Sequence, residues 1–340
     1  MRRIRIAQIG LNRYSHGPEL FFTMRQHPEI FDLVGYALVE DERKTCADKI
    51  DYFMGDAKEL TLEEILEDGS IEAVAVETDE IHLFKYAQMA VEHGKHVHME
   101  KPGSQSLADF LRLTETVERM GTVFHIGYMF RYNPVISAAV ERVKRGELGR
   151  IRSVEAHMSR YDSRAGREWL SCFRGGMMFY LGSNMLDVIL RIMGAPLCVH
   201  PMNRASGIGG TESTDLGFAV LEYPEGISFV RTDSVEVGGG NRRQIVILGE
   251  RGTVEIRPIE KEYPTPTWQC MYTSESTSCV LDENGRAVKE KTVSEPFQRY
   301  FDMISSFAAM VRGEKENPYT LAYERILYQT ILQACDWDGE

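Results

Sequence analysis

Glutamate, lysine and proline stand together at residues 100–102, inside the stretch HVHMEKPGSQS (residues 96–106). The residues before them read as a short strand, and proline cannot donate to a strand's hydrogen-bond ladder. We therefore expect Glu100 and Lys101 at a strand end, in a fixed backbone geometry. An ammonium group held at such a place could act on a ligand, whereas a plain surface turn is the alternative.

Polar residues also follow an earlier apolar run, IEAVAVET at residues 71–78. Thr78 and Asp79 end that run, and His82 lies in the helix-like segment that comes next. Each has an ordinary explanation, as a helix cap or a surface residue. Together with Glu100 and Lys101, however, they place polar groups at successive strand ends, and in a parallel sheet ligands bind beyond the carboxyl ends of the strands. This convergence favours a functional role for Lys101.

Strand-like and helix-like segments alternate over the first 125 residues. The strand-like runs are short and apolar throughout, and amphipathic segments separate them, which is typical of a parallel sheet covered on both faces. Thr61 and Glu64 have the spacing of a capping box, and Gly121 is expected to end a helix. The expected strands are residues 2–10, 31–39, 71–78, 95–100 and 122–128, and the longer expected helices are residues 16–28, 81–94 and 106–121.

The loop after the first strand, IGLNRYSHG, stands where a dinucleotide-binding protein carries its glycine-rich turn. The fingerprint Gly-x-Gly-x-x-Gly lets backbone approach a pyrophosphate at a helix N-terminus. Gly10 matches the first glycine, whereas Asn12 and Ser15 replace the other two. Asparagine tolerates positive φ and serine is small, so phosphate binding by this loop, which includes Arg13, is feasible. An ordinary strand-to-helix turn is the alternative.

An acid at the end of the second strand would hold the ribose hydroxyls of a dinucleotide. Leu38 occupies that position in the expected register, and Glu40, Asp41 and Glu42 lie just beyond it. A two-residue shift would let Glu40 serve. Otherwise these acids belong to a solvated loop or a helix cap.

The pattern changes after residue 126, where longer alternating strands take over. Residues 133–149, 177–194 and two segments of the last forty residues are expected to be helical. Five alternating segments predict an antiparallel sheet, with a tight hairpin turn at residues 283–286. We therefore expect an α/β fold: a domain with a parallel sheet at residues 1–125, then an α+β domain with a large, mainly antiparallel open sheet at 126–340. The terminal helices can pack back on the first domain.

Composition excludes several classes of protein. At 340 residues the chain is expected to form about two domains. A net charge of -12 disfavours nucleic acid as a partner, and no apolar run approaches the ~20 residues that span a bilayer. The N-terminus has no signal-peptide pattern, and six cysteines are scattered without the spacing of metal ligands. These features predict a cytoplasmic protein with reduced thiols and no structural metal.

The segments VEHGKHVHMEKPGSQSLADFLRL and YMFRYNPVISAAVERVKRGELGRIRSV resemble the glucose–fructose oxidoreductase / inositol dehydrogenase / rhizopine catabolism (Gfo/Idh/MocA) family. The resemblance covers essentially the whole chain and implies a Rossmann domain followed by an α/β domain with an open substrate-binding sheet. It implies NAD or NADP as cofactor and hydride transfer to or from a sugar or cyclitol, with Lys101 aimed at the reacting oxygen. The cofactor-binding residues expected on this basis are Gly10, Asn12, Arg13, Glu40, Thr78, His82, Glu100 and Lys101.

The chain departs from the family in a helix that usually reads Gly-Gly-x-x-x-Asp-x-Gly-x-His-x-x-Asp. Tyr180 replaces the first aspartate, Asn184 replaces the histidine that commonly acts as acid and base, and Asp187 is retained. Their spacing predicts one shared helical face, so we expect all three to contact substrate, with Tyr180 and Asn184 catalytic. Packing of Tyr180 and an ion pair of Asp187 are the alternatives. Tyr128 and Arg131 match a segment along the family's cleft and are expected to bind substrate, or to hold the two domains together.

The resemblance thus predicts an NAD(P)-dependent dehydrogenase of a sugar-like alcohol or ketone, assembled as a homo-oligomer (a dimer or tetramer). An NAD-assisted glycoside hydrolase is one alternative. A sugar- or NAD(P)-binding sensor without catalysis is another, because two glycines, the ribose acid and the histidine of the family are missing.

Overall fold

The computed structural model describes residues 2–265 and 270–337. The chain divides into two compact units. The first unit consists of the residues up to Tyr128 together with Tyr300–Arg325, and the second unit consists of Met129–Arg299 and the residues from Ile326 onward. The chain therefore leaves the first unit after Tyr128, builds most of the second, and then returns to the first.

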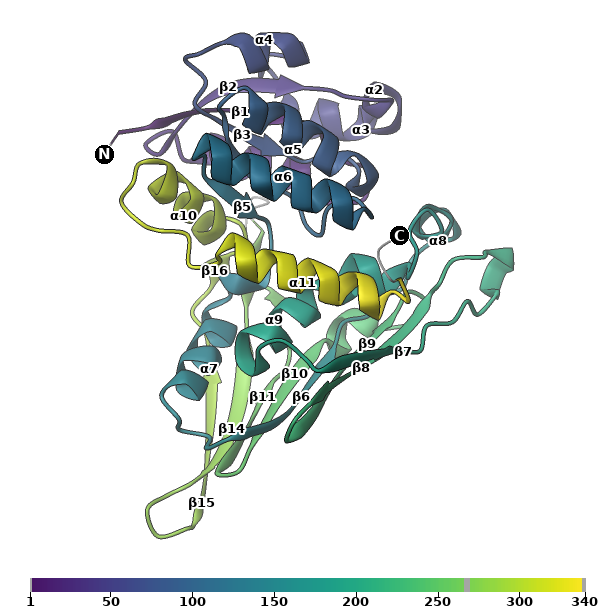
Figure 1. Ribbon diagram of the computed structural model, residues 1–340, viewed down its shortest axis with the longest axis vertical. Helices are drawn as coiled ribbons and strands as arrows, with labels where there is room; N and C mark the ends of the chain where they lie inside the picture. The colour runs from purple at the N-terminus through teal and green to yellow at the C-terminus, as the bar shows by residue number, and fades with distance from the viewer. Residues whose placement is uncertain (1, 266–269, 338–340) are drawn as a thin grey trace. The chain divides into compact units, whose positions relative to one another are not determined.

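The first unit is built on a parallel five-stranded sheet. Its helices come from the segments between the strands, and α5 and α6 lie side by side in Figure 1. The strand order is β2 (Phe31–Ala37), β1 (Ile4–Ile9), β3 (Ala73–Val76), β4 (His96–Met99) and β5 (Phe124–Ile126). The main helices are α1 (Gly17–Gln26), α4 (Leu62–Glu67), α5 (Leu83–Glu92), α6 (Leu107–Met120) and, from the returning chain, α10 (Phe301–Val311).

Local sequence explains why these elements form. All four residues of β3, Ala-Val-Ala-Val, are buried, as expected for a strand covered on both faces. Thr61 and Glu64 make the predicted capping box at the start of α4, since each side chain accepts a hydrogen bond from the other's backbone. Gly121 ends α6 in the left-handed conformation at φ +66°. These predictions from the sequence are confirmed.

The second unit contains an eight-stranded sheet that is antiparallel except for the β6–β9 pair. Helix α9 (Ser183–Met193) packs against β6 and β9, and α7 (Pro134–Lys144) packs beside it. Burial alternates along β8, so one face of the sheet is covered while the other stays accessible. The strand order is β15 (Ala287–Val293), β14 (Glu275–Leu281), β11 (Gly252–Ile256), β10 (Gln244–Gly249), β6 (Ile151–His157), β9 (Gly226–Asp233), β8 (Leu216–Tyr223) and β7 (Cys198–Pro201).

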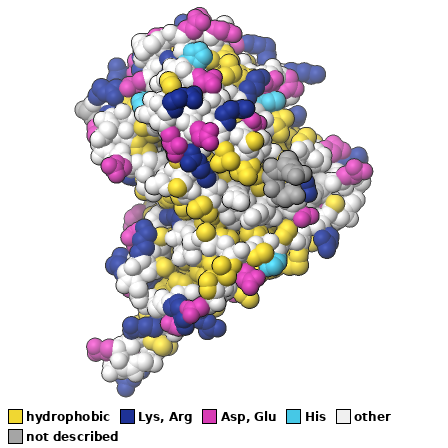
Figure 2. Space-filling model, in the orientation of Figure 1, with side chains coloured by type: hydrophobic (Ala, Val, Ile, Leu, Met, Phe, Trp, Pro, Cys, Tyr) yellow, Lys and Arg dark blue, Asp and Glu magenta, His cyan; other side chains and the backbone are white. Residues whose placement is uncertain are grey.

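The hairpin of β14 and β15 turns where the sequence predicted. Asp282 accepts hydrogen bonds from the backbone of Asn284 and Arg286, and Gly285 has φ +73°. Every residue of β15 is exposed. Figure 2 shows basic and acidic side chains interspersed over this hairpin, at the lower end of the view.

Several short elements were not predicted. They are α8 (Arg164–Leu170), β7, and a small sheet of β12 (Lys261–Glu262), β13 (Met271–Thr273) and β16 (Phe297–Gln298). These strands have two to four residues, too few for a periodic pattern to be read from the sequence. The last helix is α11 (Leu321–Ala334). None of the described helices is both long and apolar enough to cross a membrane.

Candidate active site

The loop between β1 and α1 passes very close to the end of β3. Gly10 has φ +87°, and a Cβ built on it would lie 2.6 Å from the Cβ of Thr78. Only glycine combines this φ with this close approach. Gly10 therefore brings the loop close to the carboxyl end of β3.

Asn12 holds the loop in place with its side chain, at a φ of +44°. Its Oδ1 accepts hydrogen bonds from the backbone of Tyr14 (2.8 Å) and Ser15 (3.2 Å). Its Nδ2 donates to the Thr78 carbonyl at 3.2 Å and to Oε2 of Glu80 at 3.0 Å. The residue that replaces the second glycine is thus a cross-link between the loop and the end of β3.

Glu42 also binds this loop. Its Oε1 accepts hydrogen bonds from the backbone of Leu11 (3.0 Å) and Asn12 (3.4 Å), and its Oε2 accepts one from Val39 (3.0 Å). The carboxylate is almost fully buried, and burial raises its pKa. In the sequence Glu42 stands out only as a member of an acidic run, which does not predict this contact.

Glu40, the residue expected to hold a ribose, has polar partners from α5. Its Oε1 lies 2.7 Å from Nζ of Lys85 and 2.7 Å from the hydroxyl of Tyr86, and these hydrogen bonds lower its pKa. His82 is near, with Nδ1 3.8 Å from the same oxygen. Glu40 and His82 are therefore brought together, while Leu38 packs against a hydrophobic cluster instead.

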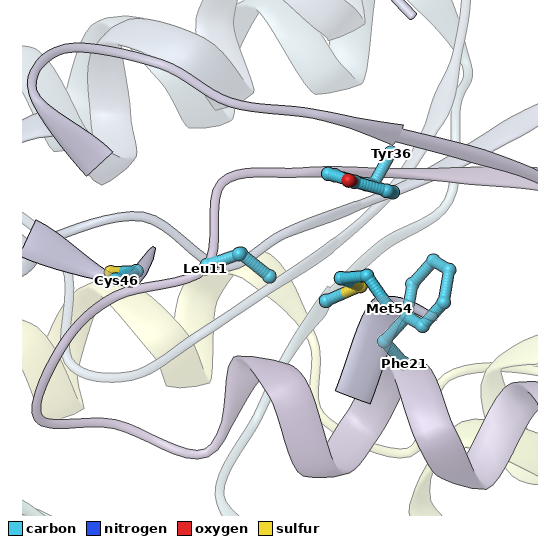
Figure 3. Packing of buried hydrophobic residues seen from close by; sticks show 5 residues of the cluster. All are labelled: Leu11, Phe21, Tyr36, Cys46 and Met54. Atoms are coloured by element: carbon cyan, nitrogen blue, oxygen red, sulfur yellow. The ribbon is translucent and has the colours of Figure 1, made fainter. Parts of the chain in front are cut away.

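That hydrophobic cluster includes a residue of the loop between β1 and α1 and anchors the loop in the first unit. It consists of Leu11 from the loop, Phe21 from α1, Tyr36 from β2, and Cys46 and Met54 from the segment after β2 (Figure 3). The rings of Phe21 and Tyr36 meet edge to face, with their centres 5.8 Å apart. Because Leu11 is fully buried here, the backbone before and after it is firmly positioned.

The start of α1 has features that suit a phosphate group. The side chain of His16, at the N-cap, makes no capping hydrogen bond, so it leaves the N–H groups of Gly17 and Glu19 to other acceptors, whereas Pro18 between them has no N–H. Oγ of Ser15 is buried and has no hydrogen-bond partner among the described residues. Arg13 is exposed, with its guanidinium 5.6 Å from the ring centre of Tyr14. These groups fit the pyrophosphate of a dinucleotide at this helix N-terminus.

Lys101 follows β4, which lies between β3 and β5 in the sheet. The Lys101–Pro102 peptide is cis. Both Glu100 and Lys101 are buried, and Nζ of Lys101 lies 3.7 Å from Oε1 of Glu100. The lysine is therefore held at a strand end away from bulk solvent, whereas a surface turn would expose it.

Three buried glutamates share the electrostatic environment of Lys101. Burial raises the pKa of Glu100 to about 7 and that of Glu80 to about 8, although the charge of Lys101 opposes both shifts. Burial and the neighbouring carboxylates also raise the pKa of Glu77. Sequence reasoning missed Glu77 and Glu80, yet their place directly around Thr78 at a strand end was the signal that could have found them.

A buried pair of histidines lies next to Glu77. Nδ1 of His98 and Nδ1 of His125 are 2.8 Å apart, so one ring must donate while the other accepts. Burial lowers the pKa of His98 to about 3, which keeps it neutral, and its Nε2 lies 3.6 Å from Oε1 of Glu77. Phe307 of α10 packs on both rings.

In the second unit, Gly175 and Gly176 precede the helical segment that carries the other predicted residues. A Cβ on Gly175 would lie 2.5 Å from Cys335, and one on Gly176 would lie 2.2 Å from the Thr214 carbonyl oxygen. Both have positive φ. The pair therefore allows two close approaches of the chain that a larger residue would block. The next turn, Met178–Gly182, is π-helical, a geometry frequent at functional sites.

Tyr180 and Asn184 lie on consecutive turns and are both buried. The ring of Trp169 meets that of Tyr180 edge-on at 4.9 Å, and Cζ of Arg160 lies 4.9 Å from the same ring centre. The side-chain oxygen and nitrogen of Asn184 are both buried and have no partner among the described residues. A buried amide without partners is costly unless a ligand or water satisfies it.

Arg131 and Asp187 bind each other. Nε and Nη2 of Arg131 donate to Oδ1 of Asp187 at 3.0 and 2.8 Å, and neither side chain is exposed beyond 1%. This ion pair is the alternative that the sequence left open for Asp187. Tyr128, which ends the first unit just after β5, is also buried.

Comparison with known proteins places the chain in a family. Residues 4–128 match the family described as "Oxidoreductase family, NAD-binding Rossmann fold", and residues 136–255 match the GFO/IDH/MocA C-terminal domain. The NAD(+)-dependent scyllo-inositol 2-dehydrogenase of Bacillus subtilis is 30% identical over 77% of this chain and 76% of its own length. An uncharacterised oxidoreductase of Escherichia coli, YdgJ, is 25% identical, and the match spans 56% of this chain and about half (54%) of that protein.

Solved structures agree with the fold. Levoglucosan dehydrogenase in complex with NADH and levoglucosan superposes with a TM-score of 0.77, covering 98% of this chain and 95% of that one at 16% identity. A mutant of KijD10, a 3-ketoreductase from Actinomadura kijaniata, in complex with TDP-benzene and NADP gives a TM-score of 0.74, with coverage of 97% of this chain and 96% of that one at 16% identity. With two matched domains and a relative at 30% identity, the chain belongs to the GFO/IDH/MocA family of oxidoreductases, whose N-terminal domain is an NAD-binding Rossmann fold.

Proposed function

We propose that this protein is an NAD(P)-dependent dehydrogenase that oxidises a hydroxyl group of a sugar or cyclitol, or reduces the corresponding ketone. The observation that carries the proposal is the buried Lys101 beside Glu100, whose pKa of about 7 suits proton exchange at neutral pH. The relatives named as scyllo-inositol 2-dehydrogenases, one with NAD(+) and one with NADP(+), support the substrate class.

The cofactor would bind along the carboxyl edge of the first unit's sheet. Its pyrophosphate would lie at Gly10, Asn12, Arg13 and Ser15, where the N-terminus of α1 leaves N–H groups uncapped. Glu40 would hold the adenosine ribose. We assign Thr78, Glu100 and Lys101 to the nicotinamide half, whereas His82, with Nδ1 3.8 Å from Oε1 of Glu40, would lie with Glu40 at the adenosine half. A bound nicotinamide supplies the hydride acceptor or donor that the chain itself lacks.

Lys101 would act on the reacting oxygen. Its ammonium group would donate a hydrogen bond that stabilises the alkoxide formed when the hydroxyl loses its proton, and this negative charge is lost again as the hydride leaves the carbon. Nζ would take up the hydroxyl proton as it gives one of its own protons to the ionised carboxylate of Glu100, whose Oε1 lies 3.7 Å away. Glu77 and Glu80, also buried with raised pKa values, keep this region able to hold a proton. Such a relay would replace the histidine that is absent at position 184.

Tyr180 and Asn184 would contact the substrate. The unsatisfied amide of Asn184 can both donate to and accept from a hydroxyl, but it cannot exchange a proton near pH 7. Tyr180 would bind through its phenol and take part in proton transfer. The Arg131–Asp187 pair would position α9, while Tyr128 would contact substrate from the end of β5.

A binding protein without catalysis is favoured by one specific observation. Glu42 and Asn12 together take up four backbone N–H groups of the loop that a pyrophosphate would otherwise use. If these contacts exclude the cofactor, the site in the second unit would still bind a sugar. Turnover separates this second candidate from the dehydrogenase.

The test is to follow the absorbance of the reduced nicotinamide with NAD and NADP, using a panel of inositols, aldoses and uronates. Net formation of NADH or NADPH with one of them supports the dehydrogenase. Cleavage of a glycoside without net reduction would identify an NAD-assisted hydrolase instead. Binding of sugar without either reaction would favour the sensor.

We also propose that the protein self-associates through the accessible face of its large sheet. Phe218 and Phe229 stack on that face at 5.4 Å, and Ile227 beside them is 59% exposed. A hollow of about 1040 Å³, lined in part by Val220 and Leu248, lies on the same strands. A second copy would cover these apolar side chains.

A cytoplasmic location is proposed as well, supported by six cysteines that are all free thiols.

A further inference from the structure

Three arginines gather at one end of the second unit's large sheet. Arg160 follows β6, and Arg243 directly precedes β10, the strand that pairs with β6 through His157 and Gln244. Nε of Arg243 donates to the carbonyl oxygen of Ser159 at 3.3 Å, which places it beside Arg160. Arg299 follows β16, and its positive charge acts on Arg243.

Two of the three arginines have a carboxylate partner. Arg299 binds Glu260 through two hydrogen bonds of 3.0 and 2.7 Å, and both side chains are less than 10% exposed. Arg160 binds Asp162, with Nε 2.8 Å from Oδ1. Arg243 has no ion pair within the parts of the chain that the structure describes. Three cations thus face two carboxylates, and Arg243 carries the excess charge.

The surroundings of Arg243 show that this charge is poorly compensated. Burial lowers the pKa of Arg243 to about 10, and the positive charges of Arg299 and Arg160 lower it too, against the opposing effects of Glu260 and Tyr180. An anion near the guanidinium would reverse this effect. Arginine also offers a planar fork of N–H donors that matches a carboxylate or phosphate.

Tyr180, which is expected to contact substrate, lies beside these arginines. Cζ of Arg160 lies 4.9 Å from the ring centre of Tyr180, and Tyr180 also contributes to the electrostatic environment of Arg243. Asn184, one helical turn beyond Tyr180, has a buried amide that no described residue satisfies. A charged donor and an unsatisfied amide therefore flank the same tyrosine. An acidic sugar would satisfy both, with its anion on the arginines and a hydroxyl on the amide.

We propose that Arg243 and Arg160 form an anion-binding subsite beside Tyr180 and Asn184, which selects substrates that carry a carboxylate or phosphate group in addition to the reacting hydroxyl. This rests on the proposed function, and it restricts the substrate class from sugars in general to acidic sugars. Arg243 supplies the uncompensated charge, Arg160 closes the subsite against Tyr180, and Asn184 orients a hydroxyl of the ligand.

Calorimetric titration of the full chain with matched pairs of ligands tests the subsite without requiring turnover. The pairs are glucuronate and glucose, galacturonate and galactose, and glucose 6-phosphate and glucose. At least one acidic member should bind roughly 10- to 100-fold more tightly than its neutral partner, as expected for charge-assisted hydrogen bonds. A preference within the uronate pairs identifies a carboxylate ligand, and one within the phosphate pair identifies a phosphate ligand.

Variants of neighbouring arginines provide the control. Arg243→Gln should abolish the preference for the acidic member, whereas Arg243→Lys should keep part of it because the charge remains. Arg242→Gln should leave the preference unchanged, because Arg242 is exposed and already paired with Glu236. Thermal melting of each variant shows whether it is folded. If Arg243→Gln does not fold, the titrations are done with Arg243→Lys in its place.

Equal binding of acidic and neutral members by the wild type overturns the proposal, and so does a preference that survives in Arg243→Gln. These outcomes differ from a failure of the proposed function. If acidic sugars bind more tightly but never lead to reduction of NAD or NADP, the subsite is supported and the proposed dehydrogenase activity is not. If neutral sugars turn over and acidic sugars show no advantage, the dehydrogenase activity is supported and the subsite is not.

Discussion

Arg131 donates two hydrogen bonds to one oxygen of Asp187, and both side chains are buried. The pair ties the turn Met129–Arg131 to α9, the helix that also carries Asn184. Charges that are buried together stabilise one another only as long as both are present. The acid that this chain shares with the family helix therefore has an internal partner, and we regard it as a positioning residue.

Asp187→Asn should accordingly cost stability. Removing one charge leaves the guanidinium buried without its counter-ion, so the free energy of unfolding should fall by about 3–5 kcal/mol. Urea denaturation measures this. Asp109→Asn is the matched control, because Asp109 pairs with Arg112 on the surface and its loss should cost less than about 1 kcal/mol. Unchanged stability together with lost turnover would instead place Asp187 against the substrate.

Glu80 should make stability depend on pH. A glutamate normally titrates near 4.5, whereas the pKa of Glu80 is raised to about 8, chiefly by burial. Between these values the folded chain holds a proton that the unfolded chain has released, so the free energy of unfolding falls as the pH rises and levels off above about 8.

Glu80→Gln cannot titrate and should flatten that fall. The variant should gain about 1–3 kcal/mol over the wild type between pH 5 and pH 9. Denaturation curves at a series of pH values test this, with Glu63→Gln on the exposed start of α4 as the control. A wild type whose stability rises between pH 5 and pH 8 while Glu80→Gln shows the same slope would contradict the protonation of Glu80.

Glu40 and Glu42 should have different effects on cofactor binding. Glu42 holds the loop backbone, so Glu42→Ala should weaken NAD and NADP alike. Glu40→Ala should weaken NAD more than NADP, because a carboxylate at the ribose disfavours a 2′-phosphate. Calorimetry with both cofactors distinguishes the two residues. If Glu40→Ala leaves the ratio of the two affinities unchanged, another residue reads the ribose.

The difference between these two glutamates shows where sequence reasoning ends. Short apolar runs predicted the parallel strands, and local patterns predicted the Thr61 capping box and the hairpin at Gly285, because such features depend only on nearby residues. Which acid of a run turns toward a loop depends on a single backbone reversal, here at Glu40 with φ +50°. The residue types around Glu40 do not predict that reversal of the backbone.

The arginine subsite shows a second limit. Arg160 and Arg243 are far apart in sequence, and they meet because β6 pairs with β10 in one particular register. Periodicity identifies both strands but not their partners or register. Lys101 was predictable for the opposite reason, because adjacent strand ends of a parallel sheet share one edge whatever the details of pairing.

The accessible sheet face should hold copies of the chain together. Phe229→Glu places a charge among apolar side chains on that face, so it should shift the protein from an oligomer to a monomer in analytical ultracentrifugation at micromolar concentration. Tyr52→Glu is the control, since Tyr52 is 71% exposed in the first unit and should not affect association. A wild type that sediments as a monomer would contradict the proposal.

Lys101 carries the central claim, and one comparison tests it most directly. The initial rate of NAD or NADP reduction should be measured for the wild type, Lys101→Ala and the exposed control Lys144→Ala, each with the best substrate of the panel. We predict that Lys101→Ala loses about 10²- to 10⁴-fold in rate while it still folds and melts cooperatively, and that Lys144→Ala matches the wild type. A folded Lys101→Ala protein that still reduces the cofactor at the wild-type rate would show that the reaction does not depend on this lysine.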